Sequence, residues 1–160
     1  WASTATGYLP RVHMPDVNTP PTMMAFDVGT QKMGMSVGQS LIASASPLPL
    51  FPMKDGIPNW DELLKIVKSH QPNLFLVGLP LNMDDSESEL STRARKFARR
   101  LRHQTNIATL MVDERLTTRE ARDELDHYQA QGRGKKLSAD SIAAALLIES
   151  WYRHPAGITP

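Results

Sequence analysis

Residues 23–34, MMAFDVGTQKMG, place one acidic side chain, Asp27, at the end of an apolar run. The run over 23–28 predicts a buried strand, and Gly29 then supplies a tight turn or a close approach of the backbone. A carboxylate among apolar neighbours is costly unless a positive charge or several hydrogen-bond donors meet it. The rest of the chain should therefore supply a partner for Asp27.

Two more strand patterns follow this run. Large and small residues alternate in KMGMSVGQ (32–39), which predicts a strand with one face kept small. The segment LIASASPL (41–48) predicts a third strand, ended by the prolines at 47 and 49. Three short strands in succession indicate an antiparallel meander.

The second half of the chain alternates helical and strand patterns. The continuous apolar run NLFLVGLP is typical of a central parallel strand covered on both faces, and IATLMVDE predicts another buried strand. Thr117 and Glu120 form a capping-box pattern, and Ser138 is a favourable N-cap for the last helix. The expected elements, in order, are a helix over 59–69, a strand over 73–80, a helix over 90–101, a strand over 107–114 and helices over 117–125 and 139–152.

This order predicts an α/β fold in one domain. A mixed five-stranded sheet would combine the antiparallel three-stranded meander with two parallel strands, and helices would cover both faces. The 160 residues suffice to bury a core, and 41% hydrophobic and 22% charged residues are ordinary for a soluble globular protein. We expect the domain at 23–153, a disordered tail or tag remnant at 1–22, and a flexible C-terminus at 154–160.

The composition excludes some classes of site. The chain has no cysteine, which rules out a disulfide framework and a thiolate metal site. No apolar run in the sequence approaches the roughly 20 residues that a membrane-spanning helix needs. Residues 1–22 also lack the basic start and apolar block of a signal peptide. We therefore expect a cytoplasmic protein without a membrane partner.

Charge is distributed unevenly, although the formal net charge is only +1. Six basic residues lie in RARKFARRLR (93–102) and three more in GRGKK (132–136), while DDSESE (84–89) is acidic. The basic helix suits either a solvated face or a track for phosphates. The loop at 132–136 is the better candidate for gripping a nucleic-acid backbone. Aromatic residues, at 6%, are too few to suggest base-stacking platforms.

Acidic residues lie at the ends of three apolar elements. Asp27 closes the first strand, Asp113 and Glu114 close the last, and Asp140 opens the last helix. Open α/β sheets place their sites outside the carboxyl ends of parallel strands, and a helix that starts there brings a third carboxylate. Carboxylates without soft ligands suit Mg²⁺ or Mn²⁺ rather than zinc. Such a cation would be the partner that Asp27 needs.

Each acidic residue also has a purely structural interpretation. Asp27 could cap backbone N–H groups of the following turn. Asp113 and Glu114 could mark the point where a strand leaves the core, paired with Arg115. Asp140 follows an N-cap, where the helix dipole alone favours an acid. Only the joint placement of these residues favours a metal site.

Five segments, in this order, resemble a known family. They are AFDVGTQKMGMSVG, VGLPLNMD, RARKFARRL, VDERLTT and KKLSADSIAAALLIESW, and they resemble segments of the YqgF family. These are RuvX-type bacterial proteins of the RNase H-like superfamily, described as Holliday-junction resolvases and as pre-16S rRNA nucleases. The resemblance covers about residues 23–153. It implies an RNase H-like fold and a metal-dependent phosphodiesterase with Asp27, Glu114 and Asp140 as catalytic residues and as ligands of Mg²⁺ or Mn²⁺.

Two positions depart from the family pattern. Gln31 stands where a basic or small polar residue is common, and Asp85 stands where glycine is usual. The second departure bears on the shape of the turn after NMD. Asp84, Asp85 and Asp113 remain alternative candidates for the second or third ligand.

The leading hypothesis is hydrolysis of a phosphodiester with one or two Mg²⁺ ions, while basic side chains hold the nucleic-acid backbone. The basic residues proposed for that role are Lys32, Arg115, Arg119, Lys135 and Lys136. The resemblance points to 5′-end processing of precursor 16S rRNA in ribosome biogenesis, with a four-way DNA junction as the alternative substrate. A resolvase would act as a two-fold homodimer, whereas a monomer favours RNA processing.

Two other classes of function stay open. The segment DVGT (27–30) is also typical of the phosphate loop of sugar kinases and actin-like ATPases. Those proteins close two such domains around a nucleotide, and 160 residues hold only one. A non-catalytic RNA-binding factor for ribosome assembly would keep the motifs without turnover.

Overall fold

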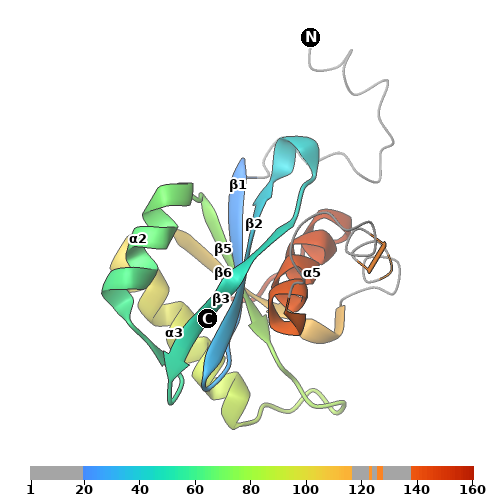
Figure 1. The fold of residues 1–160 in the computed structure, drawn as a ribbon. Coiled ribbons are helices and arrows are strands. Elements are labelled where there is room, and N and C mark those ends of the chain that lie inside the picture. Colours follow the sequence, from blue (N-terminus) through green and yellow to red (C-terminus); the bar gives the residue numbers. More distant parts are fainter. Residues whose placement is uncertain (1–19, 117–122, 124–125, 128–137) are drawn as a thin grey trace.

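The protein folds around a mixed six-stranded sheet with the strand order β4-β3-β2-β1-β5-β6 (Figure 1). This computed structural model describes residues 20–116, 123, 126–127 and 138–160. The strands β2, β3 and β4 continue antiparallel from one side of β1, and β5 and β6 are parallel to it on the other side. The elements are β1 (Thr22–Asp27), β2 (Lys32–Gln39), β3 (Ser46–Lys54), β4 (Ile57–Pro58), α2 (Trp60–His70), β5 (Leu74–Leu79), α3 (Glu89–Thr105), β6 (Ala108–Asp113) and α5 (Ala139–Arg153).

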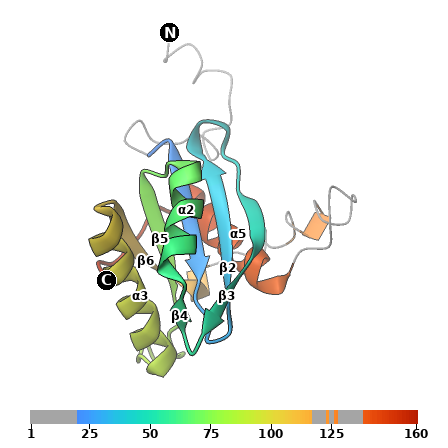
Figure 2. The same ribbon diagram turned by 60° about the vertical axis from the view of Figure 1, so that its left-hand side comes forward.

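Helices cover both faces of the sheet, as predicted. The helices α2 and α3 lie on one face and α5 on the other (Figure 2). Under α2 and α3, the ring of Phe26 on β1 lies 5.7 Å from Phe75 on β5 and 5.5 Å from Phe97 on α3, measured between centroids. Burial of each such side chain contributes roughly 1.5–3 kcal/mol. This cluster therefore fixes β1 at the centre of the molecule.

The small face of β2, predicted from its alternating pattern, is the face on which α5 packs. A Cβ added at Gly38 would lie 2.8 Å from Cγ2 of Ile148 and 2.9 Å from the hydroxyl of Tyr152. That hydroxyl donates to the carbonyl of Ser44 over 2.9 Å. The helix therefore approaches the backbone of β2 closely, which brings its first turn toward the end of β1.

β3 runs over Ser46–Lys54 rather than over the predicted 41–48. Ser40–Ile42 instead form a 3-10 turn. The prolines inside β3 are tolerated because β4 pairs only with its last two residues, Met53 and Lys54, so β3 is an edge strand over most of its length.

The sixth strand, β4, is missing from the predicted set of five. Asp55 and Gly56 have φ angles of 51° and 80°, the positive values of a two-residue hairpin turn. The Asp-Gly dipeptide is a known sequence signal for such a hairpin. The hairpin tip docks on the loop after β1, where the N–H of Gly56 donates to the carbonyl of Thr30 over 2.8 Å.

Both ends of the described core are joined to the sheet. β1 begins at Thr22, one residue before the predicted start. Residues 154–160, predicted as a flexible C-terminus, return to β6, where the backbones of Met111 and Ile158 exchange hydrogen bonds of 2.7 and 2.9 Å. Arg95 also donates to the carbonyl of Thr159 over 3.1 Å. The segment therefore covers part of the open edge of β6.

Some predicted features lie outside the described residues. They include nearly all of the helix over 117–125 and most of the tail over 1–22. Of the helices that the structure does describe, none has the length and apolar character to span a membrane.

Candidate active site

Asp27 ends β1 at the centre of the sheet. On one side it pairs with Gly34 of β2, and on the other side β1 pairs with β5. The preceding residue, Phe26, is fully buried, whereas Asp27 is partly exposed, so Asp27 is the point where the strand leaves the core. The sheet therefore fixes the backbone that carries this carboxylate.

Glu114 reaches Asp27 across the intervening strand β5. It follows β6 in a 3-10 turn over Glu114–Leu116, and β5 separates β6 from β1. A Cβ at Gly78 of β5 would collide with Oε1 of Glu114. The missing side chain at Gly78 thus opens the path along which Glu114 forms a hydrogen bond with the carboxyl group of Asp27.

The first turn of α5 brings Asp140 to the same edge. A Cβ at Gly34 would collide with the backbone carbonyl of Asp140, so α5 rests directly on the cross-strand neighbour of Asp27. The predicted N-cap is confirmed, because Oγ of Ser138 accepts a hydrogen bond of 3.1 Å from the N–H of Ser141. Asp140 is therefore near enough for its charge to raise the pKa of Asp27.

The acidic side chains perturb one another's protonation. Burial, together with the charge of Asp27, raises the pKa of Glu114 to about 8. Burial also raises the pKa of Asp27, which the charge of Asp140 increases further and the hydrogen bond with Glu114 opposes. A neutral Glu114 carboxyl that donates to a charged Asp27 explains both directions. Perturbed carboxyl groups of this kind are typical of functional sites.

Lys32 lies beside Asp140, with Nζ 3.3 Å from Oδ2. The Lys32 side chain is 61% exposed, so this ion pair adds little to stability. Over the part of the chain that the structure describes, no group of three His, Asp or Glu side chains is arranged to hold one metal ion. The three-ligand cation site therefore stays a prediction, based on the pair Asp27 and Glu114 with Asp140 nearby.

The profile of the family described as "RuvX: Holliday junction resolvase" matches residues 21–154. The chain belongs to the RuvX family. A relative from Acinetobacter baylyi is 74% identical over 147 residues, which cover 92% of this chain and 100% of the relative. A relative from Histophilus somni is 47% identical over 135 residues, which cover 84% of this chain and 96% of the relative. Both relatives carry the name "Putative pre-16S rRNA nuclease".

A solved structure shares the RuvX fold. RuvC of Thermus thermophilus, in complex with a Holliday junction substrate, matches with a TM-score of 0.58 at 12% identity, covering 86% of this chain and 98% of RuvC. A second RuvC structure from the same organism gives a TM-score of 0.56. At such low identity the likeness concerns the fold alone. It confirms the predicted RNase H-like architecture.

In this RuvX chain, Arg115 connects two loops at the edge of the site. Its guanidinium donates to Oδ2 of Asp113 over 2.8 Å, to Oδ1 of Asp85 over 2.7 Å and to the carbonyl of Asn82 over 2.9 Å. The hydrogen bonds from Arg115 lower the pKa of Asp113. Asp113 thus follows the structural interpretation, whereas Glu114 turns toward Asp27. A contact of Arg115 with a bound phosphate stays a prediction.

The other alternative ligands have partners of their own. Oδ1 of Asp84 accepts hydrogen bonds from the N–H and hydroxyl of Ser86 over 3.0 and 2.5 Å. Asp85 has a φ of 69°, a left-handed conformation that explains why glycine is usual there. Of the predicted backbone-binding residues, Lys32 lies at the site, and Arg119, Lys135 and Lys136 lie outside the described residues.

Gly34 and Gly78 are positions that the sequence patterns do not assign to the site. An isolated glycine within an apolar strand indicates a close approach by another group, and Gly78 fits that rule within FLVGLP. The rule does not say which group approaches. In the RuvX chain the approaching groups are the Glu114 side chain at Gly78 and the Asp140 backbone at Gly34.

Proposed function

We propose that this RuvX-family protein is a nuclease that hydrolyses phosphodiester bonds in structured nucleic acid with the help of Mg²⁺ or Mn²⁺. The main support is the hydrogen-bonded pair Asp27 and Glu114, with Asp140 within electrostatic reach. Two carboxylates buried side by side are unfavourable unless a proton or a cation lies between them. The pair also lies at the strand ends, where open α/β sheets place their sites.

Asp27, Glu114 and Asp140 would hold the cation, because carboxylate oxygens are the ligands that Mg²⁺ and Mn²⁺ prefer. When bound, a divalent cation supplies positive charge that stabilises the phosphodiester oxygens while water attacks phosphorus and the P–O ester bond breaks. The shared proton must leave Glu114 before its carboxylate can serve as a ligand, so cation affinity should rise with pH. Lys32, beside Asp140, would hold a neighbouring phosphate.

We infer that the substrate is precursor 16S rRNA, cut near its 5′ end. The Acinetobacter baylyi relative named for pre-16S rRNA supports this inference, since it is 74% identical over 92% of the chain. The description of the family profile supports a four-way DNA junction as the second candidate. Junction resolution needs two symmetric cuts, which a two-fold homodimer would provide.

Incubation of the purified protein with Mn²⁺ and both substrates tests the proposal. We expect cleavage of a matched precursor-16S RNA by the wild-type protein and no detectable cleavage by Asp27→Asn. An Asp27→Asn protein that cleaves as fast as wild type, in nuclease-free preparations, contradicts the proposal. RNA binding without turnover at any cation concentration would favour the non-catalytic assembly factor. Cleavage of the junction alone, by a dimer, would favour the resolvase.

A further inference from the structure

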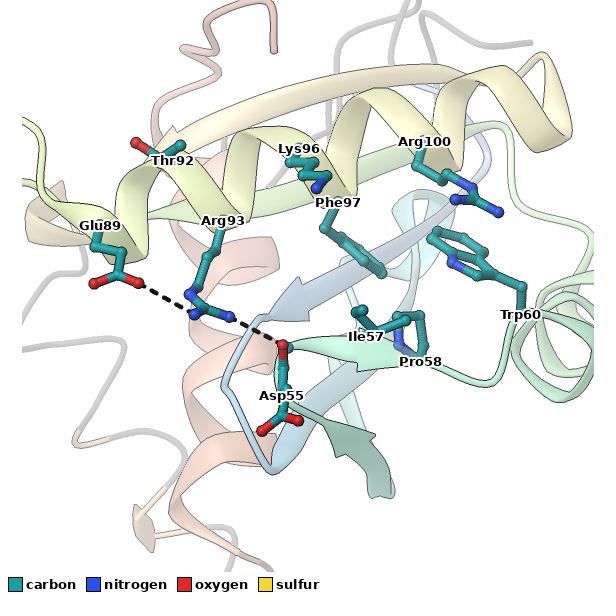
Figure 3. Close-up of a pocket in the computed structure, with 11 residues that line it drawn as sticks. Asp55, Ile57, Pro58, Trp60, Glu89, Thr92, Arg93, Lys96, Phe97 and Arg100 are labelled. Atoms are coloured by element: carbon teal, nitrogen blue, oxygen red, sulfur yellow. Dashed lines mark hydrogen bonds and ion pairs between the residues drawn. The ribbon is translucent and has the colours of Figure 1, made fainter.

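A groove of about 420 Å³ lies between α3 and the hairpin of β3 and β4 (Figure 3). The helix contributes Arg93, Lys96 and Arg100 to its lining, and the hairpin contributes Ile57 and Pro58. These three basic residues belong to the segment 93–102, for which the sequence allows either a solvated face or a phosphate track. The groove shows that part of this helix faces a concave, partly apolar surface.

Arg100 is held in place at the groove by an aromatic side chain. Its guanidinium carbon lies 5.3 Å from the centre of the Trp60 ring, and Trp60 stacks on Phe97 with 5.5 Å between ring centroids. A guanidinium that stacks on a ring keeps its fork of N–H donors available for a phosphate. Because it is held by the ring, less conformational entropy is lost when a ligand binds.

The acidic residues of the groove leave two of its cations uncompensated. Glu89 pairs with Arg93 at 3.1 Å. Asp55 turns its backbone carbonyl toward Arg93, which donates to it over 3.0 Å, while its carboxylate points away from α3 (Figure 3). No ion pair among the described residues involves Lys96 or Arg100. These two side chains therefore give the groove its positive charge.

The apolar side of the groove indicates that the ligand carries more than charge. Ile57 is 63% exposed although it is apolar, and it lies at the rim opposite α3. A simple anion gains nothing from such a surface, whereas the sugar or base of a nucleotide can cover it. Lys96 and Arg100 are about 6 Å apart along the helix axis, a spacing suited to successive phosphates of an extended strand. Positively charged grooves with aromatic or apolar walls are typical of sites for single-stranded nucleic acid.

The hairpin tip connects the groove to the loop that follows Asp27. The hairpin tip binds the loop after β1, where Gly56 donates to Thr30, three residues beyond Asp27. Arg93 joins α3 to the same tip through Asp55. The acidic residues face α5 and the groove lies on the α3 side of the sheet, so a strand that joins the two passes around the end of the sheet at this hairpin tip.

We propose that this groove binds an unpaired strand of the nucleic-acid substrate that continues from the acidic site. Its phosphates bind Lys96 and Arg100, and a sugar or base covers Ile57. This inference rests on the proposed nuclease function, and it adds the form of the substrate: a duplex region next to a single-stranded extension.

Fluorescence anisotropy tests the proposal with a labelled RNA hairpin that is either blunt or extended by an unpaired tail of about eight nucleotides. Binding is measured with a chelator present, so that nothing is cleaved. We expect the tail to raise the affinity of the wild-type protein about tenfold, and this ratio to fall toward one in Lys96→Gln and Arg100→Gln. The salt dependence of tailed binding should decrease by about 0.7 in logarithmic slope for each lost contact.

Arg99→Gln is the matched control, because it makes the same charge change on α3 at a residue that does not line the groove. It should keep the tenfold ratio. Arg100→Gln also loses the contact with Trp60 and could lose stability, whereas Lys96 makes no such aromatic contact. Lys96→Gln therefore tests the loss of charge alone. A ratio near one in the wild-type protein, or an equal loss in Arg99→Gln, overturns the proposal. Displacement of the tailed hairpin by a poly-glutamate peptide with the same efficiency as by unlabelled RNA also overturns the proposal.

Cleavage of the blunt and the tailed hairpin in the presence of Mn²⁺ separates this proposal from the nuclease function. Tail-dependent binding without cleavage by the wild-type protein would contradict the nuclease and leave the groove as a nucleic-acid site. Cleavage that requires Asp27, without any effect of the tail on affinity, would contradict the groove alone.

Discussion

Gly78 has no side chain, and for that reason the carboxyl group of Glu114 can cross β5 and meet Asp27. Gly34 acts in the same way for the backbone of Asp140. Both glycines influence the site through space rather than through charge. Substitutions at these residues therefore test the position of the acidic groups without removing any of them.

Gly78→Ala should displace the Glu114 carboxyl and lower the rate of nucleic-acid cleavage by about 100-fold, the cost of a misplacement near 1 Å. Stability should fall by only about 1–3 kcal/mol, as for other overpacked positions. Cleavage rates and thermal unfolding measure the two effects. Gly157→Ala is the control, since its Cβ would crowd Leu110 at 2.9 Å, away from the acidic residues. Equal losses of cleavage in both variants would contradict a specific role for Gly78.

Glu114 should make the free energy of unfolding fall as pH rises. Its pKa is about 8 in the folded chain against an ordinary 4.5, so between these values the folded form binds the proton and the unfolded form has lost it. The stabilisation by the protonated pair is complete below pH 4.5 and disappears as pH rises through about 8. We expect a decline of about 2 kcal/mol, less than the full shift implies because the group is partly exposed.

Urea denaturation of chelator-treated protein between about pH 5 and 8 measures this decline. Glu114→Gln keeps a donor toward Asp27 but cannot titrate, so its stability should vary much less over the same range. Asp84→Asn is the control, because the ordinary pKa of 3.8 for this exposed group, lowered further by hydrogen bonds from Ser86, keeps its titration below the window. If the free energy of unfolding of Glu114→Gln falls with pH as steeply as that of the wild-type protein, other groups cause the decline.

At the scale of elements, the sequence predicts the buried strands and the amphipathic helices well. β5 is a continuous apolar run, β6 buries Met111 and Val112, and α2 has the apolar spacing of its pattern, so burial and local preference agree. The prediction is wrong for the two strands at the other edge of the sheet. β3 contains prolines that only an edge strand tolerates, and β4 has two residues, too few for any periodic pattern.

The N-terminus of α5 is the element end on which Asp140 depends. Ser138→Ala removes the cap of that helix and should lower stability by about 1 kcal/mol and also reduce cleavage, because Asp140 lies in the frayed turn. Asn59→Ala is the matched control, since Asn59 caps α2 by accepting from Glu62 over 3.2 Å, on the other face of the sheet. It should lower stability similarly without affecting Asp140. Chemical denaturation and initial cleavage rates distinguish the two, and equal activities would contradict this role of the cap.

At the scale of the whole molecule, the sequence predicts where the site lies better than it predicts which residues form it. Carboxyl ends of parallel strands share one edge, so the convergence of Asp27, Asp140 and the acids after β6 follows from element order. The choice between Asp113 and Glu114 does not follow, because adjacent residues at a strand end point in different directions. The family resemblance selected Glu114, and the passage left by Gly78 gives the physical reason.

The C-terminal segment should protect the sheet from pairing with other chains. Removal of residues 155–160 deletes the hydrogen bonds between Ile158 and Met111 and exposes the edge of β6. We expect the shortened protein to associate as its concentration rises, measured by light scattering after size-exclusion chromatography. Ile158→Lys is the control, because the lost bonds are backbone bonds that this variant keeps. A shortened protein with the mass of the full chain at every concentration would contradict the expectation.

The acidic residues come from positions 27, 114 and 140, so long stretches of chain separate Asp27 from both partners. Such distant parts meet late in folding, since the intervening segments must first be ordered. During translation, a nascent chain that exposes Asp27 has neither partner in place, and α5 can dock on Gly34 only after residues 139–153 have been made. On the proposed function, the enzyme therefore stays inactive toward RNA until α5 has been made and has docked.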